Sequence, residues 1–109
     1  MLAASQSIGK LQSRNGTTVS LREHNFVLNA PGAQEVFLVG DFNNWDAANN
    51  GTLLRGPGGY WALQLRIPNR PQHYFFVVDR EFVVDPDAAG TVFYEPVGRK
   101  VSFVPGGQR

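Results

Sequence analysis

Residues 60–67 read Tyr-Trp-Ala-Leu-Gln-Leu-Arg-Ile, and this stretch decides the fold class. Every second residue is large and apolar, and an extended chain would point these residues to one side: Trp61, Leu63, Leu65 and Ile67. The residues between them are mostly polar or small and would point to the other side. This alternation is typical of an antiparallel strand with one buried face.

The same period of two recurs on both sides of this stretch, and turn signals such as Asn50-Gly51 separate the repeats. Twelve glycines and seven prolines punctuate the chain, and no segment keeps a helical apolar stripe. The sequence therefore predicts an all-β sandwich of two antiparallel sheets with seven to eight strands and almost no helix. The predicted core consists of Phe26, Leu28, Val36, Leu38, Trp61, Leu63, Leu65, Tyr74, Phe76 and Val78.

A chain of 109 residues fits one domain that can bury a core without disulfides or metal. We expect a flexible N-terminal segment at 1–16, the sandwich at 17–104 and a flexible tail at 105–109. The chain has no cysteine, which excludes disulfide frameworks, zinc ribbons and thiol catalysis. A cysteine-free chain suits the cytoplasm, which is the predicted location.

The formal net charge is only +1, from ten basic and nine acidic residues spread along the sequence. Nucleic-acid or anionic-lipid binding normally requires a concentrated basic face, so neither partner is expected. The first ten residues lack the apolar run of a signal peptide. No stretch approaches the roughly 20 apolar residues of a membrane span, so we expect a soluble domain.

Residues 36–46, Val-Phe-Leu-Val-Gly-Asp-Phe-Asn-Asn-Trp-Asp, form a strand that runs into a polar turn ending in Trp45. One interpretation is that Trp45 caps the end of the sandwich, with its indole N–H bonded to a carbonyl. The other is that the indole offers a face to a ligand, for which a sugar ring is the obvious candidate. The sequence pattern alone leaves both open.

The polar side chains of this turn also raise the question of a calcium site. A calcium loop of the EF-hand type needs glycine at its sixth position and glutamate at its twelfth. Counting from Asp41, those places are held by Asp46 and Thr52. Asparagine and aspartate in tight turns usually bond their own backbone, so no metal is predicted.

Catalytic groups are also poorly represented. Neither histidine accompanies a serine or cysteine in a recognisable nucleophile motif. Asp79, Asp85 and Asp87 could be considered as paired carboxylates for glycoside hydrolysis, but Asp85-Pro86 fits a turn better. We therefore expect a protein that is not an enzyme and needs no cofactor.

Four blocks occur in an order that resembles a known family: 38–46, 59–65, 73–79 and 85–86. The set is similar to the glycogen-binding domain of the AMP-activated protein kinase β subunit. That domain belongs to the family 48 carbohydrate-binding modules, the early-set domains found before branching and debranching amylases. The resemblance covers residues 22–104. It implies an immunoglobulin-like sandwich and the binding of α-1,4-linked glucan such as glycogen or starch.

Three aromatic residues of this chain stand at positions that the family uses for its ligand. Trp45 matches the tryptophan that stacks on a glucose ring in kinase-type members. Phe82 occupies the place of a second stacking tryptophan and keeps an aromatic ring there. Phe75 stands where the family has a lysine, and strand alternation predicts that it lies on an outer face.

The polar positions of the family match less closely. An asparagine near the start of the last strand reads sugar hydroxyls in the family, and the nearest residues here are Arg99 and Lys100. A Leu-Gly-Thr clamp is absent, although Phe93 and Tyr94 lie in the corresponding loop. The carbohydrate-binding residues predicted from the resemblance are Trp45, Phe82, Phe75, Tyr94, Arg99 and Lys100.

The predicted function is a non-catalytic carbohydrate-binding module that recognises α-1,4-glucan by aromatic stacking. The alternative is a protein-interaction or regulatory early-set domain with a degenerate sugar site. Trp45 in its intact block favours the first function, and Phe75 in place of the lysine favours the second. The expected partner is thus an α-glucan, with a partner protein or a fused enzyme domain as the further candidates.

One turn departs from the family pattern. The family places glycine after the position of Asp79, because a two-residue hairpin turn often needs a positive φ there. This chain has Arg80 instead. Either the turn adopts another type, or Arg80 takes the left-handed conformation that is costly for a residue with a Cβ atom.

Overall fold

A computed structural model describes residues 20–106, in which eight β-strands and two short 3-10 helices are connected by turns. The helices are η2 (Asp41–Asn43) and η3 (Pro57–Gly59). The strands are β2 (Leu21–Asn29), β3 (Val36–Gly40), β4 (Leu54–Arg55), β5 (Tyr60–Pro68), β6 (Gln72–Val78), β7 (Glu81–Val83), β8 (Gly90–Tyr94) and β9 (Arg99–Val104). The expected flexible segment at 1–16 and the end of the expected tail, residues 107–109, lie outside the described residues.

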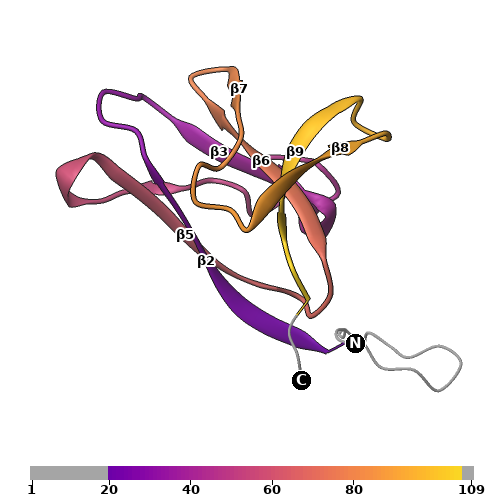
Figure 1. Ribbon diagram of the computed structural model, residues 1–109. Helices are drawn as coiled ribbons and strands as arrows, with labels where there is room; N and C mark the ends of the chain where they lie inside the picture. The colour runs from indigo at the N-terminus through magenta and orange to yellow at the C-terminus, as the bar shows by residue number, and fades with distance from the viewer. Residues whose placement is uncertain (1–19, 107–109) are drawn as a thin grey trace, which may run out of the picture.

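The strands form two antiparallel sheets that lie face to face (Figure 1). The smaller sheet has the order β2-β5-β4. The larger sheet has the order β3-β6-β9-β8, and β7 pairs with β6 off this path. No helix in residues 20–106 has the length and apolar character that crossing a membrane requires. The predicted fold class, an immunoglobulin-like β-sandwich of seven to eight strands, is confirmed.

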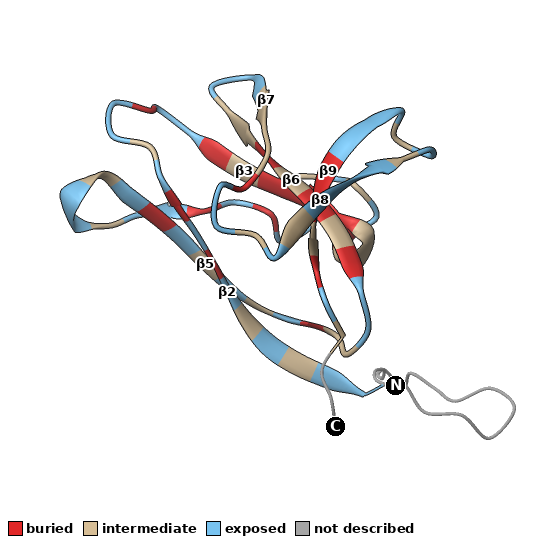
Figure 2. Ribbon diagram, viewed as in Figure 1, coloured by how far each residue is buried: buried red, intermediate tan, exposed pale blue. Residues whose placement is uncertain are grey.

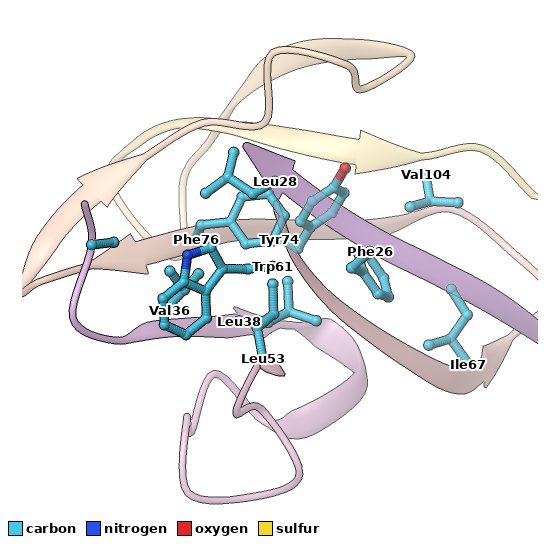
Figure 3. Close-up of a cluster of buried hydrophobic side chains, with 11 residues drawn as sticks. Phe26, Leu28, Val36, Leu38, Leu53, Trp61, Ile67, Tyr74, Phe76 and Val104 are labelled. Atoms are coloured by element: carbon cyan, nitrogen blue, oxygen red, sulfur yellow. The ribbon is translucent and has the colours of Figure 1, made fainter. Parts of the chain in front are cut away.

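The alternation in residues 60–67 has the predicted structural result. Trp61 and Ile67 are buried, while Leu63 and Leu65 are partly buried and pack against the core. Most buried residues lie in the strands of the two sheets (Figure 2). Figure 3 labels most members of the core cluster, which contains Phe26, Leu28, Ala33, Val36, Leu38, Leu53, Trp61, Ile67, Tyr74, Phe76 and Val104.

The core differs from the prediction at a few positions. Val78, like Leu63 and Leu65, is only partly buried, whereas Leu53 and Val104 are buried but were not predicted. Leu53 lies outside the alternating stretches, and its backbone N–H donates to the Val36 carbonyl at 3.0 Å. This bond ties the loop before β4 to β3, and strand periodicity in the sequence carries no signal for such a contact.

Trp61 occupies the core as predicted. Its indole Nε1–H donates to the Ala30 carbonyl at 3.1 Å, which satisfies the polar atom that burial would otherwise leave without a partner. The Arg55 guanidinium carbon lies 4.9 Å from the indole centroid. Trp61 is therefore fixed inside the sandwich, and the two tryptophans of the chain have different environments.

The turn between β6 and β7 adopts the left-handed alternative. Asp79 and Arg80 have φ angles of 48° and 74°, and the flanking Val78 and Glu81 are paired. Two central residues with positive φ between paired strands are typical of a type I′ hairpin turn. The Asp79 carboxylate accepts the backbone N–H groups of residues 34 and 35 at 2.8 and 2.9 Å, which holds this turn against the loop before β3.

Asp85 belongs to a buried polar network between the sheets. Its Oδ2 accepts the hydroxyl of Tyr74 at 2.6 Å, and its backbone N–H donates to the Ser102 hydroxyl at 2.7 Å. Its Oδ1 accepts the backbone N–H of Asp87 at 2.9 Å. Burial, followed by the hydrogen bond to Asp85, raises the pKa of Tyr74 far above its usual range. Asp79 and Asp85 thus have structural partners in the turn and the core.

Candidate functional site

The loop after β3 is locked into a shape that projects Trp45 from the end of the strand. Asn43 is buried, and its side chain accepts the Gly40 N–H at 2.9 Å and donates to the Leu38 carbonyl at 2.9 Å. The backbone N–H of Trp45 donates to the Gly40 carbonyl at 3.0 Å. These bonds satisfy the turn internally, as the chemistry of asparagine in turns predicts.

Two successive residues of this loop, Asn44 and Trp45, have positive φ angles of 61° and 58°. Asparagine tolerates the left-handed region, but a bulky aromatic residue is a genuine outlier there. Such strain persists only where surrounding contacts determine the conformation, and it concentrates at functional sites. The conformation of Trp45 therefore marks this loop as a candidate site.

Glycine at position 40 allows this loop to approach the sheet closely. A Cβ atom at Gly40 would lie 2.5 Å from the His73 carbonyl oxygen and 2.8 Å from the Tyr74 Cβ. Only glycine permits so close an approach of β3 to β6. The Trp45 loop consequently begins directly against the strand that carries His73 and Phe75.

Five rings form what we call the aromatic row: His73, Tyr94, Trp45, Phe75 and Phe82. Trp45 lies 5.7 Å from Phe75 and 5.9 Å from Tyr94, measured between ring centroids, and the latter pair is tilted by only 26°. Phe75 contacts Phe82 at 4.4 Å, and His73 stacks on Tyr94 at 4.0 Å with an interplanar angle of 14°. The contacts are continuous from one end of the row to the other.

The aromatic row covers the outer face of the larger sheet, opposite the core. His73 and Phe75 alternate along β6 with the core residues Tyr74 and Phe76. In β9, the successive residues Val101 and Ser102 are both fully buried, so both faces of the sheet are covered at this point. A sandwich with one solvated face per sheet would expose one of two successive strand residues.

Trp45 is half-buried in this arrangement. Fully overlapping rings would have centroids about 3.5–4 Å apart, the usual carbon contact distance. At 5.9 Å and 26° the Trp45 and Tyr94 rings are displaced sideways, so that neither ring fully covers the other. Trp45 thus keeps part of its surface exposed to solvent beside a second ring.

Asp41 joins the Trp45 loop to both neighbouring strands of the row. Its Oδ2 accepts the backbone N–H of His73 at 2.7 Å and lies 2.8 Å from the His73 Nδ1. Its Oδ1 accepts the Tyr94 hydroxyl at 3.3 Å. The Asp41 charge, followed by burial and this hydrogen bond, raises the pKa of Tyr94 above its usual range.

The predicted site residues are brought together with one exception. Trp45, Phe75, Phe82 and Tyr94 lie in the aromatic row, and the Arg99 guanidinium carbon lies 3.7 Å from the Phe82 ring centroid. Lys100 is separated from them, because it pairs with Phe93 while Arg99 pairs with Tyr94. Successive strand residues point to opposite faces, so Lys100 and Phe93 lie on the face away from the row.

Sequence reasoning missed Asp41 and His73 as parts of this arrangement. The sequence pattern presents Asp41 only as a possible calcium ligand, and His73 only as a histidine without a nucleophile motif. The parity that His73 shares with Phe75 was the available signal, since it places both side chains on one face of β6. Residues 20–106 contain no group of three or more histidine, aspartate and glutamate side chains arranged to hold a metal ion.

Comparison with known proteins bears on this arrangement. The family model for carbohydrate-binding module 48 (isoamylase N-terminal domain) matches residues 13–94. The 1,4-alpha-glucan branching enzyme GlgB 2 of Rhizobium johnstonii is 36% identical over 81 residues, which cover 73% of this chain and 10% of the enzyme. The corresponding enzyme of Bradyrhizobium diazoefficiens is 45% identical over 51 residues, covering 47% of this chain and 7% of that one.

A mutant pullulanase from Paenibacillus barengoltzii, solved in complex with maltotetraose, has the same fold over 82% of this chain and 15% of its own. The TM-score is 0.54 and the sequence identity 23%. The chain thus spans about a tenth of the length of the curated relatives it matches. On the strength of the family match, the chain belongs to the carbohydrate-binding module 48 (isoamylase N-terminal domain) family.

Proposed function

We propose that this carbohydrate-binding module binds α-1,4-linked glucan, of the glycogen or starch type, on the outer face of its larger sheet. The observation that carries the proposal is the aromatic row, in which a strained turn closed by hydrogen bonds holds Trp45 half-exposed beside Tyr94. Family membership supports the general class of ligand. The branching enzymes that this chain is similar to are named for 1,4-alpha-glucan, which supports the linkage type.

Stacking on aromatic rings would supply most of the affinity. A pyranose ring has an apolar C–H face that lies against an indole or phenol ring through hydrophobic contact and attraction to the π-electrons. By analogy with nucleobases on aromatic platforms, each stacked ring contributes about 1–3 kcal/mol. The 26° tilt between Trp45 and Tyr94 suits neighbouring sugars of a bent chain better than sugars of a flat ribbon.

Arg99 is the candidate for reading hydroxyl groups. Its guanidinium lies over the Phe82 ring at 3.7 Å, a cation–π contact that orients the group. A guanidinium carries five N–H donors, and those not facing the ring can donate to sugar oxygens. In this proposal Phe82 acts through Arg99, because the guanidinium lies between the ring and a ligand on that side.

The affinity for a short oligosaccharide should be low. Two platforms and one arginine leave many sugar hydroxyls to water, and a dissociation constant on the order of 0.1–1 mM corresponds to such a small set of contacts. A long glucan offers many equivalent sites along its length, which compensates in the natural setting. In a longer polypeptide, such as those of the relatives, the module would hold a fused enzyme domain near its substrate.

One observation favours the alternative function, a protein-interaction or regulatory domain with a degenerate sugar site. The outer face carries Phe75, and Val92 at its edge is 40% exposed, so part of this surface is apolar without an obvious hydroxyl partner. Apolar surface of this kind also suits a protein partner. Titration with sugar separates the two functions.

The test is a fluorescence titration with maltoheptaose and with β-cyclodextrin. Trp61 is buried and its N–H is bonded, so a change in tryptophan emission would report on Trp45. We expect a saturable change that disappears in Trp45→Ala and persists in Tyr60→Ala, since Tyr60 is 50% exposed on the smaller sheet. Cellohexaose should produce no change at the same concentration.

Saturating maltoheptaose without any spectral change would rule the proposal out and leave the protein-interaction function. As a check on catalysis, incubation with starch should release no new reducing ends. Circular dichroism of both variants should match that of the wild-type protein, so that a lost signal reflects the site.

A further inference from the structure

We propose that Asp41 and His73 form a positioning pair that holds the Tyr94 ring beside Trp45 as the second sugar platform. The inference rests on the proposed function and deepens it. Neither residue needs to contact the ligand, because both act through Tyr94. The proposal also assigns the second platform to Tyr94, where the family resemblance had pointed to Phe82.

The carboxylate of Asp41 is the point where three elements meet. Asp41 begins η2, the turn whose continuation carries Trp45. Its Oδ2 is bonded to the His73 backbone N–H in β6, and its Oδ1 accepts the Tyr94 hydroxyl at the end of β8. One side chain therefore sets the distance between the Trp45 loop and the strand end that carries Tyr94.

His73 provides the surface on which Tyr94 rests. The two rings lie 4.0 Å apart and nearly parallel, at 14°, which is close overlap rather than an edge contact. The His73 Nδ1 lies 2.8 Å from Asp41 Oδ2, so the imidazole is itself fixed in orientation. One face of Tyr94 is thus occupied by His73.

Tyr94 needs this support because of its place in the fold. It is the last residue of β8, which lies at the end of the strand order, and the chain then turns back through residues 95–98. The Tyr94 carbonyl accepts the N–H groups of Val97 and Gly98, but these bonds hold the backbone only. A side chain at such an edge loses rotamer freedom when a ligand immobilises it, and holding the ring in place beforehand removes that cost.

Phe82 is less suited to be the second platform. The Arg99 guanidinium carbon already lies 3.7 Å from the centroid of its ring, and the Phe75 ring makes an edge contact with it at 4.4 Å and 62°. By contrast, the known contacts of Tyr94 are the His73 stack, the sideways-displaced Trp45 ring and the Asp41 bond at its hydroxyl. Tyr94, which is half-buried and more nearly parallel to the Trp45 ring than Phe75 is, at 26° against 40°, is therefore the ring that we assign as the second platform.

The experiment compares His73→Ala with His73→Phe, which keeps a ring under Tyr94. Maltoheptaose affinity is measured by fluorescence, and the proton NMR signals of the Tyr94 ring are measured without sugar. In His73→Ala we expect the affinity to fall about three- to tenfold, as for a side chain that must be ordered on binding. The Tyr94 ring signals should lose the ring-current shift caused by stacking.

His73→Phe should restore both the affinity, to within about twofold, and the shifted signals. Thermal unfolding of both variants checks that the fold is intact, and a merely structural role would not make affinity follow the Tyr94 signals. Wild-type affinity in a folded His73→Ala protein would overturn the positioning inference alone. Absence of binding in the wild-type protein would instead remove the proposed function, and this inference with it.

Discussion

The outer faces of the two sheets both carry exposed apolar side chains, but they differ in how these are held. On the smaller sheet, Leu54 is 71%, Tyr60 50% and Val27 40% exposed. On the larger sheet the aromatic row is mostly half-buried, and each of its rings contacts another. Exposure alone is ordinary on a protein surface, whereas a fixed array of rings on an outer face calls for an explanation.

The difference originates in the polar residues around each face. The larger sheet has a closed turn that fixes Trp45, a carboxylate that reaches two strands and a guanidinium over Phe82. On the smaller sheet, the cross-strand side-chain bond of the outer face joins Gln64 to Glu23 at 3.1 Å, and neither residue is aromatic. For this reason we place the proposed binding surface on the face whose rings are held in position, and not on the face whose apolar side chains are merely exposed.

The largest expected effect is the difference in maltoheptaose affinity between the Trp45→Ala and Tyr60→Ala variants. Trp45→Ala should weaken maltoheptaose binding by about tenfold or more, because one stacked ring contributes about 1–3 kcal/mol. Tyr60→Ala removes a more exposed aromatic ring from the smaller sheet and should leave the affinity unchanged. Isothermal titration calorimetry of both variants measures the difference, and equal losses would erase the distinction between the faces.

Asn43→Ala tests whether the closed turn is what distinguishes the larger sheet. The substitution leaves the buried Gly40 N–H and Leu38 carbonyl without their partner, which should cost about 1–3 kcal/mol of unfolding free energy. Binding should weaken as well, since the turn carries Trp45. Urea unfolding measures the first effect, with substitution of the exposed Asn29 of β2, Asn29→Ala, as the matched control. Unchanged stability in Asn43→Ala would count against the account of the turn.

Arg99 and Lys100 provide a finer comparison within one strand. Arg99→Ala should weaken glucan binding about three- to tenfold, because it removes one or two charge-assisted hydrogen bonds. Solvent exposure makes each of these bonds weaker than a buried one. Lys100→Ala removes a charge of the same sign from the opposite face and should have no effect. Affinity measurements at two salt concentrations check that the difference between the two variants depends on the position of the residue and not on the loss of a positive charge. A larger loss of affinity in Lys100→Ala than in Arg99→Ala would place the ligand on the other face of the sheet.

The smallest expected effect concerns pH. Burial lowers the pKa of His24 below its usual range, the Arg22 charge lowers it further, and Asp85 opposes both. Near the usual histidine pKa of about 6.5, the unfolded chain then binds more protons than the folded one, so stability falls as pH decreases. The Tm should drop between about pH 7.5 and 5.5, and less so in His24→Gln. Parallel Tm profiles for the two proteins would contradict this assignment.

The sequence predicts the fold better than it predicts the site because strand alternation is a local property. Residues 60–67 define an inward and an outward face by themselves, and the structure confirms both. The same alternation places Phe75 outward. Strand alternation does not indicate which strands become neighbours. The approach of Tyr94 to Trp45 depends on the order of strands in the sheet, which the sequence pattern does not predict.

The remaining differences between the predicted and the observed site depend on strand register and on contacts between distant elements. Arg99 and Lys100 are adjacent, and a shift of one residue exchanges their faces, so the choice between them depends on the turn at 95–98. The role of Asp41 depends on three elements meeting at one carboxylate, and no spacing in the chain indicates that meeting. Side chains that position others are harder to predict than side chains that form the surface.

The most direct test of the central claim uses the two indole N–H signals in a proton–nitrogen NMR spectrum. During titration with maltoheptaose, the Trp45 signal should move progressively to saturation. The Trp61 signal should stay in place, because its N–H is bonded to the Ala30 carbonyl inside the core. A Trp45 signal that stays fixed at saturating sugar would contradict the claim that its ring is the glucan platform.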